Sequence, residues 1–247
     1  MKMAQTFREY YEKEAKHIRR YDSTSFWDSR YHRKRKEFIA TILKSFLHME
    51  TFLDVGCGTG EYLFEVSKFC DEPIGLDVSS TYLKRIKRKN KELSLIQADA
   101  QALPLKDKCI DYVLCSETIE HLQDPEIAIQ EISRVACKEF IISTPNYGFL
   151  RVAMVKISKV FVRELDKSVR HVNILSLLQL HEKILKNKCK IKLEKTLHVI
   201  PPIIGEKLHM SPKLSPLLDM SEFIFDKFFP RLGNISIVEC RVIHNST

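Results

Sequence analysis

The stretch Leu53-Asp-Val-Gly-Cys-Gly-Thr-Gly60 decides the fold. It follows an apolar run at 51–55 that is typical of a buried strand, and it precedes a helical pattern at 61–70. Glycine is scarce elsewhere, because the chain of 247 residues has 7 glycines and three of them lie here within five positions. Since glycine lets the backbone turn tightly and approach a ligand closely, the stretch predicts a ligand-binding loop between a strand and a helix.

The spacing of the glycines distinguishes between classes of ligand. A dinucleotide-binding loop has the pattern G-x-G-x-x-G, whereas the third glycine comes one position earlier here and Glu61 stands in its place. A pyrophosphate would therefore meet a carboxylate at the start of the helix. This spacing favours a ligand without phosphates, one that carries an amino-acid moiety.

Strands and helices alternate outward from the glycine stretch. Each helical pattern is about ten residues long, which predicts an α/β protein with a parallel sheet and helices on both of its faces. The later predicted strands are 73–78, 93–98, 110–116, 140–143, 190–199 and 235–243, and the later predicted helices are 81–91, 125–135 and 174–187.

Acidic residues follow three neighbouring strands of the predicted sheet. Asp54 lies at the first strand, Asp77 ends the second, and Asp99 ends the third. Ligands bind in the crevice outside the carboxyl ends of such strands. We therefore expect Asp77 to accept hydrogen bonds from ribose hydroxyls and Asp99 to accept one from an adenine amino group.

Four motifs in order carry a resemblance to a known family. The glycine stretch, Gly75-Leu-Asp-Val-Ser79, Gln97-Ala-Asp-Ala100 and Asp111-Tyr-Val-Leu-Cys-Ser116 resemble the successive motifs of class I S-adenosylmethionine-dependent methyltransferases. The segment 116–125 is similar to the motif of the branch that includes ubiquinone-pathway O-methyltransferases. The resemblance covers roughly residues 50–146. It implies a Rossmann-like doubly wound sheet, mostly parallel with a final antiparallel strand, together with N-terminal helices and a helical lid insertion.

The resemblance also implies S-adenosylmethionine as the cofactor and a set of residues that bind it. The glycines would face the methionine part, with Asp54 ordering their loop. Asp77 would hold the ribose, and Ser116 would lie near the sulfonium. The implied cofactor site consists of Asp54, Gly56, Cys57, Gly58, Gly60, Asp77, Val78, Asp99, Ala100 and Ser116. No metal site is expected.

Glu120 and His121 are the candidate catalytic residues, because their family counterparts lie in the pocket. A hydroxyl or an acidic carbon that accepts a methyl group needs a base, and imidazole titrates near neutrality. The alternative is that His121 is a loop residue that caps the helix beginning near Asp124 and Pro125.

The net charge of +8 is concentrated in two patches. Residues 1–48 carry twelve Lys and Arg against six Asp and Glu, and the run 84–91 carries six Lys and Arg. Such patches attract nucleic acid or anionic membranes, or they are solvated helix faces. The solvated interpretation is favoured, because the chain has no aromatic-rich nucleic-acid motif.

We expect a helical cap at 1–48, with helices at 4–20 and 28–48, and a methyltransferase domain at 49–247. Tyr10, Tyr11, Tyr21 and Trp27 would either form a lid over the cofactor or pack in the ordinary way. The apolar segments 149–165 and 201–233 are predicted to lie on the acceptor side, where they would cap an apolar acceptor and contact a membrane surface. The alternative for them is a helical lid or a dimer contact without a lipid role.

Seven scattered cysteines, without a Cys-x-x-Cys pair, favour reduced thiols in a cytoplasmic protein. The sequence thus predicts a methyltransferase that transfers a methyl group to oxygen, carbon or nitrogen of a small-molecule or lipid-like acceptor. Two alternatives remain open. One is an RNA or protein methyltransferase that uses the basic patches, and the other is a non-catalytic cofactor-binding protein. The sequence does not predict the oligomeric state.

Overall fold

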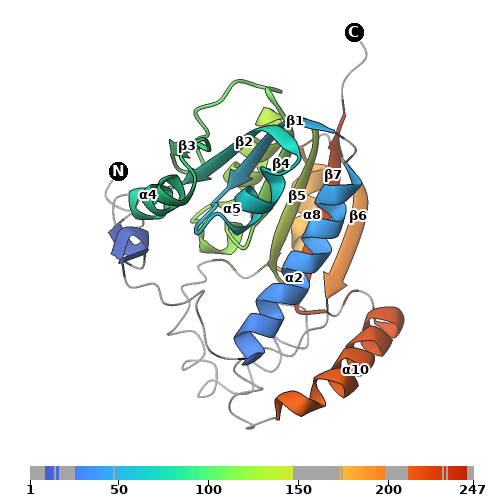
Figure 1. Cartoon of the computed structure of the whole chain (residues 1–247). Helices are drawn as coiled ribbons and strands as arrows, with labels where there is room; N and C mark the ends of the chain where they lie inside the picture. Colours follow the sequence, from blue (N-terminus) through green and yellow to red (C-terminus); the bar gives the residue numbers. More distant parts are fainter. Residues whose placement is uncertain are drawn as a thin grey trace.

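A seven-stranded sheet with the strand order β3-β2-β1-β4-β5-β7-β6 forms the centre of the molecule (Figure 1). The computed structural model describes residues 9–13, 15–16, 26–46, 48–146, 173, 175–187, 189–197, 211–229, 231 and 233–243. The strands are β1 (Met49–Val55), β2 (Cys70–Asp77), β3 (Ser94–Gln97), β4 (Ile110–Ser116), β5 (Ala136–Pro145), β6 (Cys189–Leu197) and β7 (Ile235–Val242).

One strand runs against all the others. The pairs β1–β2, β2–β3, β1–β4 and β4–β5 are parallel, whereas β7 is antiparallel to both β5 and β6. This confirms the prediction of a mostly parallel sheet with a final antiparallel strand. The strand order reverses between β1 and β4, and an open α/β sheet binds its ligands at such a switch point, outside the carboxyl ends of the strands.

Helices cover both faces of the sheet. Phe52 of β1 belongs to a core that includes residues of α2 (Phe26–Ser45) and α3 (Glu61–Val66). Its neighbour Leu53 belongs to the core of the other face, with residues of α5 (Pro125–Val135) and α8 (Leu177–Leu185). Because successive side chains of a strand point to opposite faces, burial on both sides explains why Phe52 and Leu53 of β1 are both apolar.

Several predicted boundaries are wrong by a few residues, and strand pairing explains two of them. The helix predicted for 61–70 ends at Val66, because β2 begins at Cys70, which is opposite Met49 of β1. The strand predicted for 140–143 is longer, because β7 pairs with β5 from Glu139 to Pro145. The helix predicted for 28–48 begins two residues earlier, because α2 starts at Phe26.

The N-terminal part of the chain packs into the same core as the rest. The α2 side chains of Ile39 and Leu43 are at most 1% exposed and lie in one cluster with residues of β1. The predicted division between a cap at 1–48 and a domain at 49–247 stays a prediction. Residues 4–8 and 17–25 of the predicted N-terminal elements lie outside the described residues.

A helical segment is inserted between β6 and β7. It contains the short 3-10 helix η2 (Pro212–Leu214) and helix α10 (Ser215–Phe228), which lies near the N-terminal end of α2 (Figure 1). The predicted segment 149–165 and residues 201–210 lie outside the described residues. Among the described helices, none is both long enough and apolar enough to cross a membrane.

Candidate active site

The glycine loop has a backbone conformation that other residues rarely adopt. Gly56, Gly58 and Gly60 have φ angles of +73°, +48° and +80°. These values lie in the left-handed region, where a Cβ atom is strained. The amides of Gly56 and Cys57 donate to the carbonyl of Leu76 at 2.7 and 2.9 Å, which fixes the loop to β2.

The space around the glycines differs from one to the next. A Cβ atom on Gly56 would lie 2.3 Å from Oγ1 of Thr118, whereas a Cβ on Gly58 would have no atom within 4 Å. Gly56 is therefore required by packing, while Gly58 leaves open space beside the loop. The Cys57 side chain is 6% exposed, and burial raises the pKa of its thiol. Cys57 is therefore a small, buried and uncharged side chain at neutral pH.

Asp77, at the end of β2, joins two loops through its carboxylate. Oδ2 accepts a hydrogen bond from the amide of Gly58, and Oδ1 accepts one from the amide of Ser79, both at 2.8 Å. Burial raises the pKa of Asp77, although these backbone hydrogen bonds act in the opposite direction. The sequence assigned the ordering of the glycine loop to Asp54, but in the structure Asp77 makes the hydrogen bond to the loop.

Asp54 is buried, and one of its carboxyl oxygens is unsatisfied within the part of the chain that the structure describes. Its side chain is 2% exposed, and Oδ2 has no partner among the described residues. Burial, followed by the charges of Asp77 and Glu61, raises the pKa of Asp54 to about 8. A buried carboxyl group without a partner is costly unless a ligand satisfies it.

The residues predicted to bind adenine lie at the end of β3. Oδ1 of Asp99 accepts a hydrogen bond from the amide of Gln101 at 2.9 Å, and Ala100 is 6% exposed. The carbonyl of Val78 accepts a hydrogen bond from Nε2 of Gln97 at 3.0 Å. The hydrogen bond between Gln97 and Val78 holds the ends of β2 and β3 together, so Val78, Asp99 and Ala100 follow the carboxyl ends of two neighbouring strands.

The end of β4 contributes a residue that the sequence analysis missed. Glu117 has a φ angle of +52°, and its Oε2 lies 3.1 Å from NH1 of Arg35, which is buried in α2. Although burial acts in the opposite direction, the charge of Glu117 raises the pKa of Arg35. Oγ of Ser116 lies 2.8 Å from Oγ of Ser143 in β5. Arg35 lies far from Glu117 in the sequence, so no local pattern indicates the ion pair between them.

Glu120 and His121 lie in the short 3-10 helix η1 (Ile119–His121), which follows β4. Glu120 is 1% exposed, and its Oε2 accepts a hydrogen bond from Oγ1 of Thr144 at 3.2 Å. Nε2 of His121 lies 3.7 Å from Oε1 of Glu120, and the His121 side chain is 20% exposed. Burial and then the charge of Glu117 raise the pKa of Glu120.

Helix α5 has its own cap, which bears on the alternative role of His121. The side chain of Asp124 accepts hydrogen bonds from the amides of Glu126 and Ile127. The described contacts therefore give the capping role to Asp124, and His121 lies one helical turn before it.

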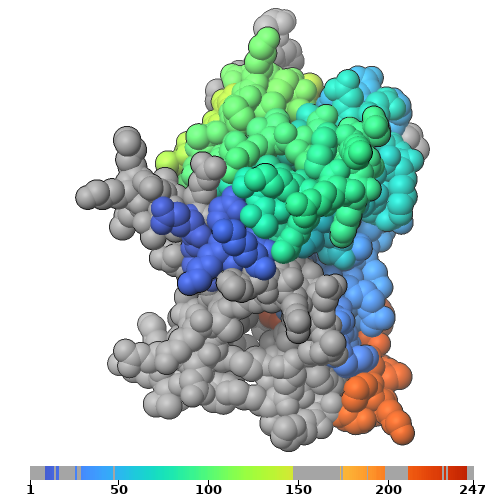
Figure 2. All heavy atoms as spheres, turned by 60° about the vertical axis from the view of Figure 1, so that its left-hand side comes forward, coloured from blue at the N-terminus to red at the C-terminus, as the bar shows by residue number. Residues whose placement is uncertain are grey.

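Residues 9–13 and 15–16 lie beside α4 (Ser80–Lys89), as Figure 2 shows. The carboxylate of Glu12 accepts hydrogen bonds from the amides of Ser80 and Thr81 and from the Thr81 hydroxyl. Although burial alone would raise it, these hydrogen bonds lower the pKa of Glu12 to about 2.

The same segment also contacts the candidate base. The rings of Tyr11 and His121 are edge-to-face, with centroids 5.8 Å apart. Residues 9–13 thus connect the start of α4 with η1, and the choice between a lid and ordinary packing for Tyr10 and Tyr11 stays a prediction. Tyr21 and the side chain of Trp27 lie outside the described part of the chain.

Oxygen atoms without hydrogen-bond partners gather at the carboxyl ends of β1 and β4. Among the described residues, Oδ2 of Asp54, Oε1 of Glu117 and Oε1 of Glu120 are buried and make no hydrogen bond. No group of three or more His, Cys, Asp or Glu in the described residues could hold a metal ion. The crevice therefore has acceptors for the polar groups of an organic ligand, and open space at Gly58 beside them.

Comparisons with known proteins agree with this arrangement. A family model described as "Methyltransferase domain" matches residues 53–142, which include the glycine loop, Asp77, Asp99 and η1. Demethylmenaquinone methyltransferase of Staphylococcus carnosus is 39% identical over 89 residues, which cover 34% of this chain and 37% of that protein.

Two further relatives extend the likeness. An uncharacterised protein of Methanocaldococcus jannaschii is 37% identical over 101 residues, covering 40% of this chain and 42% of that protein. This chain thus spans less than half the length of these curated relatives. The crystal structure of magnesium protoporphyrin IX methyltransferase from Synechocystis, with bound S-adenosylhomocysteine, has a TM-score of 0.69 at 14% identity. That match covers 97% of this chain and 100% of the other, and it concerns the fold.

The order of the strands, the glycine loop between β1 and α3, and the match to the family model agree with one another. Residues 53–142 match the methyltransferase domain family, and the sheet around them has the fold of S-adenosylmethionine-dependent methyltransferases.

Proposed function

We propose that the protein binds S-adenosylmethionine in the crevice at the carboxyl ends of β1 to β4 and transfers its methyl group to a small-molecule acceptor. The observation that carries this proposal is the buried Oδ2 of Asp54, which has no hydrogen-bond partner among the described residues, together with the open space at Gly58 of the same loop. A buried acceptor of this kind fits the amino-acid portion of the cofactor, which brings an ammonium group.

Different residues of the crevice would bind different parts of the cofactor. Asp54 and the glycine loop would hold the methionine portion, while Asp77 would accept hydrogen bonds from the ribose. Asp99 and Ala100 would bind the adenine, and Ser116 would lie near the reacting group. The bound cofactor supplies a methyl group that its sulfonium already activates, so the chain contributes chiefly proximity and alignment.

His121 is the proposed base, and Glu120 is a positioning residue. Because burial raises the pKa of Glu120, its neutral form is favoured, which makes it a poor proton acceptor near neutral pH. The His121 side chain is partly exposed and adjacent to Oε1 of Glu120. His121 would accept the proton from the acceptor at an imidazole nitrogen, while Glu120 and Tyr11 limit the orientation of the ring.

The acceptor class is drawn from two relatives. Their names show that one acts on demethylmenaquinone and the other on magnesium protoporphyrin IX. These names support a small, largely apolar or lipid-like acceptor for this chain. A reducing, cytoplasmic location is part of the same proposal and is supported by the seven cysteines, all of which are free thiols.

A methyl-transfer assay tests the catalytic part of the proposal. The full chain is incubated with methyl-labelled S-adenosylmethionine and with panels of phenols, quinone precursors, lipids and tRNA. His121→Gln is expected to lower kcat by about a hundredfold or more and to leave the affinity for the cofactor unchanged. His48→Gln is the matched control, because His48 is 65% exposed and lies outside the crevice. Methylation of tRNA alone, or equal rates for both variants, would contradict the proposal.

A further inference from the structure

Helix α10 presents its acidic side chains to the protein and its large apolar side chains to the solvent. Asp219, Glu222 and Asp226 follow one another at helical spacing, so the three carboxylates form one narrow stripe. Glu222 is 6% exposed, although it is charged. An ordinary surface helix has the opposite orientation, because its apolar stripe faces the core.

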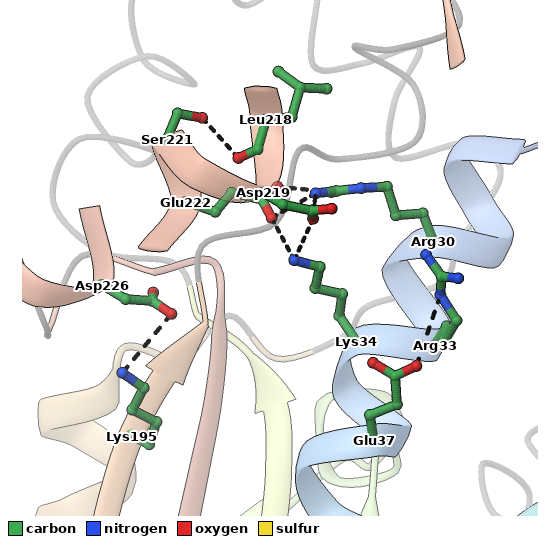
Figure 3. A network of polar contacts seen from close by, with 10 residues as sticks. All are labelled: Arg30, Arg33, Lys34, Glu37, Lys195, Leu218, Asp219, Ser221, Glu222 and Asp226. Atoms are coloured by element: carbon green, nitrogen blue, oxygen red, sulfur yellow. Dashed lines mark hydrogen bonds and ion pairs between the residues drawn. The ribbon is translucent and has the colours of Figure 1, made fainter. Parts of the chain in front are cut away.

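Cations of α2 and β6 hold this acidic stripe (Figure 3). The Arg30 guanidinium binds both oxygens of Glu222, at 2.7 and 2.6 Å, and its NH2 also binds Asp219 at 2.6 Å. The ammonium of Lys34 lies between the same two carboxylates. Lys195 of β6 lies 3.8 Å from Asp226. These contacts fix the rotation of α10 about its axis and turn its other faces outward.

The outward faces are unusually apolar for an exposed helix. Phe223 is 68% exposed, Phe228 67%, Leu217 60% and Met220 59%. A contiguous apolar surface of this kind marks an interaction site with a protein or a membrane. The same surface also includes Leu214, Ile224, Phe225 and Phe229.

The charges on the two sides of α10 differ in sign. Among the described residues of 211–231, the three carboxylates are engaged by cations of the protein body, as described above. Lys213 precedes α10 and Lys227 lies in its last turn, and both are exposed. Large apolar side chains bordered by lysines are the composition of helices that lie in the interface of an anionic membrane.

We propose that the outward surface of α10, formed by Leu217, Met220, Phe223 and Phe228 and bordered by Lys213 and Lys227, binds an anionic lipid bilayer. The bilayer supplies apolar depth for the aromatic rings and negative headgroups for the lysines. A second copy of this chain fits less well, because the same lysines would face one another. The inference does not depend on methyl transfer, so it stands or falls separately from the proposed function.

Vesicle flotation with the full chain tests this surface. Vesicles of phosphatidylcholine with phosphatidylglycerol are compared with vesicles of phosphatidylcholine alone, at low and at high salt. The chain is expected to float with the anionic vesicles at low salt and to be released as salt rises. The double variant Phe223→Ser/Phe228→Ser is expected to lower the partition coefficient at least tenfold. Leu178→Ser is the matched control, because Leu178 of α8 is also 60% exposed.

Fluorescence gives a second readout that does not require the loss of two aromatic rings. Brominated lipids in anionic vesicles should quench the tryptophan emission of Phe223→Trp more strongly than that of the parent chain. In the parent chain, Trp27 is the only tryptophan and gives the background signal. Three results would overturn the proposal: no flotation of the parent at low salt, equal partitioning of the double variant, or equal quenching in Phe223→Trp and the parent. Sedimentation that shows a dimer of the parent and a monomer of the double variant would also overturn it, in favour of a second copy on this surface.

Discussion

The glycine loop and helix α10 differ in how far along the chain their contacts reach. The loop takes its shape from its own backbone, and its hydrogen bond to Asp77 joins residues only 19 positions apart. The orientation of α10 depends on Arg30, which is 192 positions from Glu222. A local motif therefore predicts the first feature, whereas only the folded chain reveals the second.

Helices α4 and α10 also differ in which face of their amphipathic pattern is buried. In α4, the apolar residues Leu83 and Ile86 are buried and the basic run points outward, as a solvated helix should. In α10, the same amphipathic principle applies with the faces exchanged, because buried cations on α2 make the acidic stripe the inner one. Amphipathicity thus shows that a helix has two faces, and the partner decides which of them is inside.

The largest expected effect comes from removing the cation that orients α10. Arg30→Ala removes the guanidinium that binds both oxygens of the buried Glu222, so we expect the free energy of unfolding to fall by about 3 kcal/mol. Denaturant unfolding measures this change. Arg33→Ala is the control, because Arg33 is 58% exposed and should change stability by less than about 0.5 kcal/mol. Equal effects of the two variants would mean that the stripe does not hold α10.

Two alanine substitutions in the glycine loop distinguish a glycine that packing requires from a glycine that borders the open space for a ligand. Gly56→Ala places a Cβ atom against Thr118, so overpacking should cost about 1–3 kcal/mol of stability in addition to backbone strain. Gly58→Ala meets no atom, so strain of about 1 kcal/mol is its main cost.

Both substitutions should weaken the binding of S-adenosylmethionine, because the loop shape or the open space is altered. Thermal unfolding and calorimetric titration of both variants measure the two effects. If Gly58→Ala kept full affinity for the cofactor, the space beside Gly58 would not be a ligand site.

Asp54 predicts a dependence of stability on pH in the ligand-free protein. Its pKa of about 8 in the folded chain exceeds the value of 3.8 for an ordinary Asp side chain, so between these values the folded state binds more protons than the unfolded state. Stability should therefore fall as pH rises through this window, with a slope of at most about 1.4 kcal/mol per pH unit. Asp54→Asn should flatten this part of the profile, as measured by denaturant unfolding at several pH values. An unchanged profile would show that Asp54 is ionised in the folded chain.

The smallest expected effect concerns the contact between Glu12 and α4. Glu12→Ala removes a carboxylate that caps the start of α4, which should weaken the attachment of residues 9–13 by about 1 kcal/mol. Limited proteolysis of the N-terminal segment should then become about fivefold faster. Lys13→Ala, which changes an exposed neighbour, should leave the rate unchanged. Because the pKa of Glu12 is about 2, the contact should persist in mild acid and be lost only near that pH.

The sequence predicts the mostly parallel sheet and the polar residues at its strand ends well, because each motif combines an apolar strand with the polar residues that follow it. Asp54, Asp77 and Asp99 come at the ends of neighbouring strands as expected. The partners that complete the crevice are less predictable. Arg35 reaches Glu117 from α2, and Glu12 reaches α4 across 68 positions. These contacts require the tertiary fold, as does the exchange of faces in α10.

Binding of the cofactor at the glycine loop is tested most directly by a calorimetric titration of the full chain with S-adenosylhomocysteine, repeated with Gly58→Ala and with Leu178→Ser. We expect saturable binding at one site, the same affinity for Leu178→Ser, and a clear loss of affinity for Gly58→Ala. Absence of binding to the parent chain, or equal affinity for all three proteins, would contradict the assignment of a cofactor site to the glycine loop.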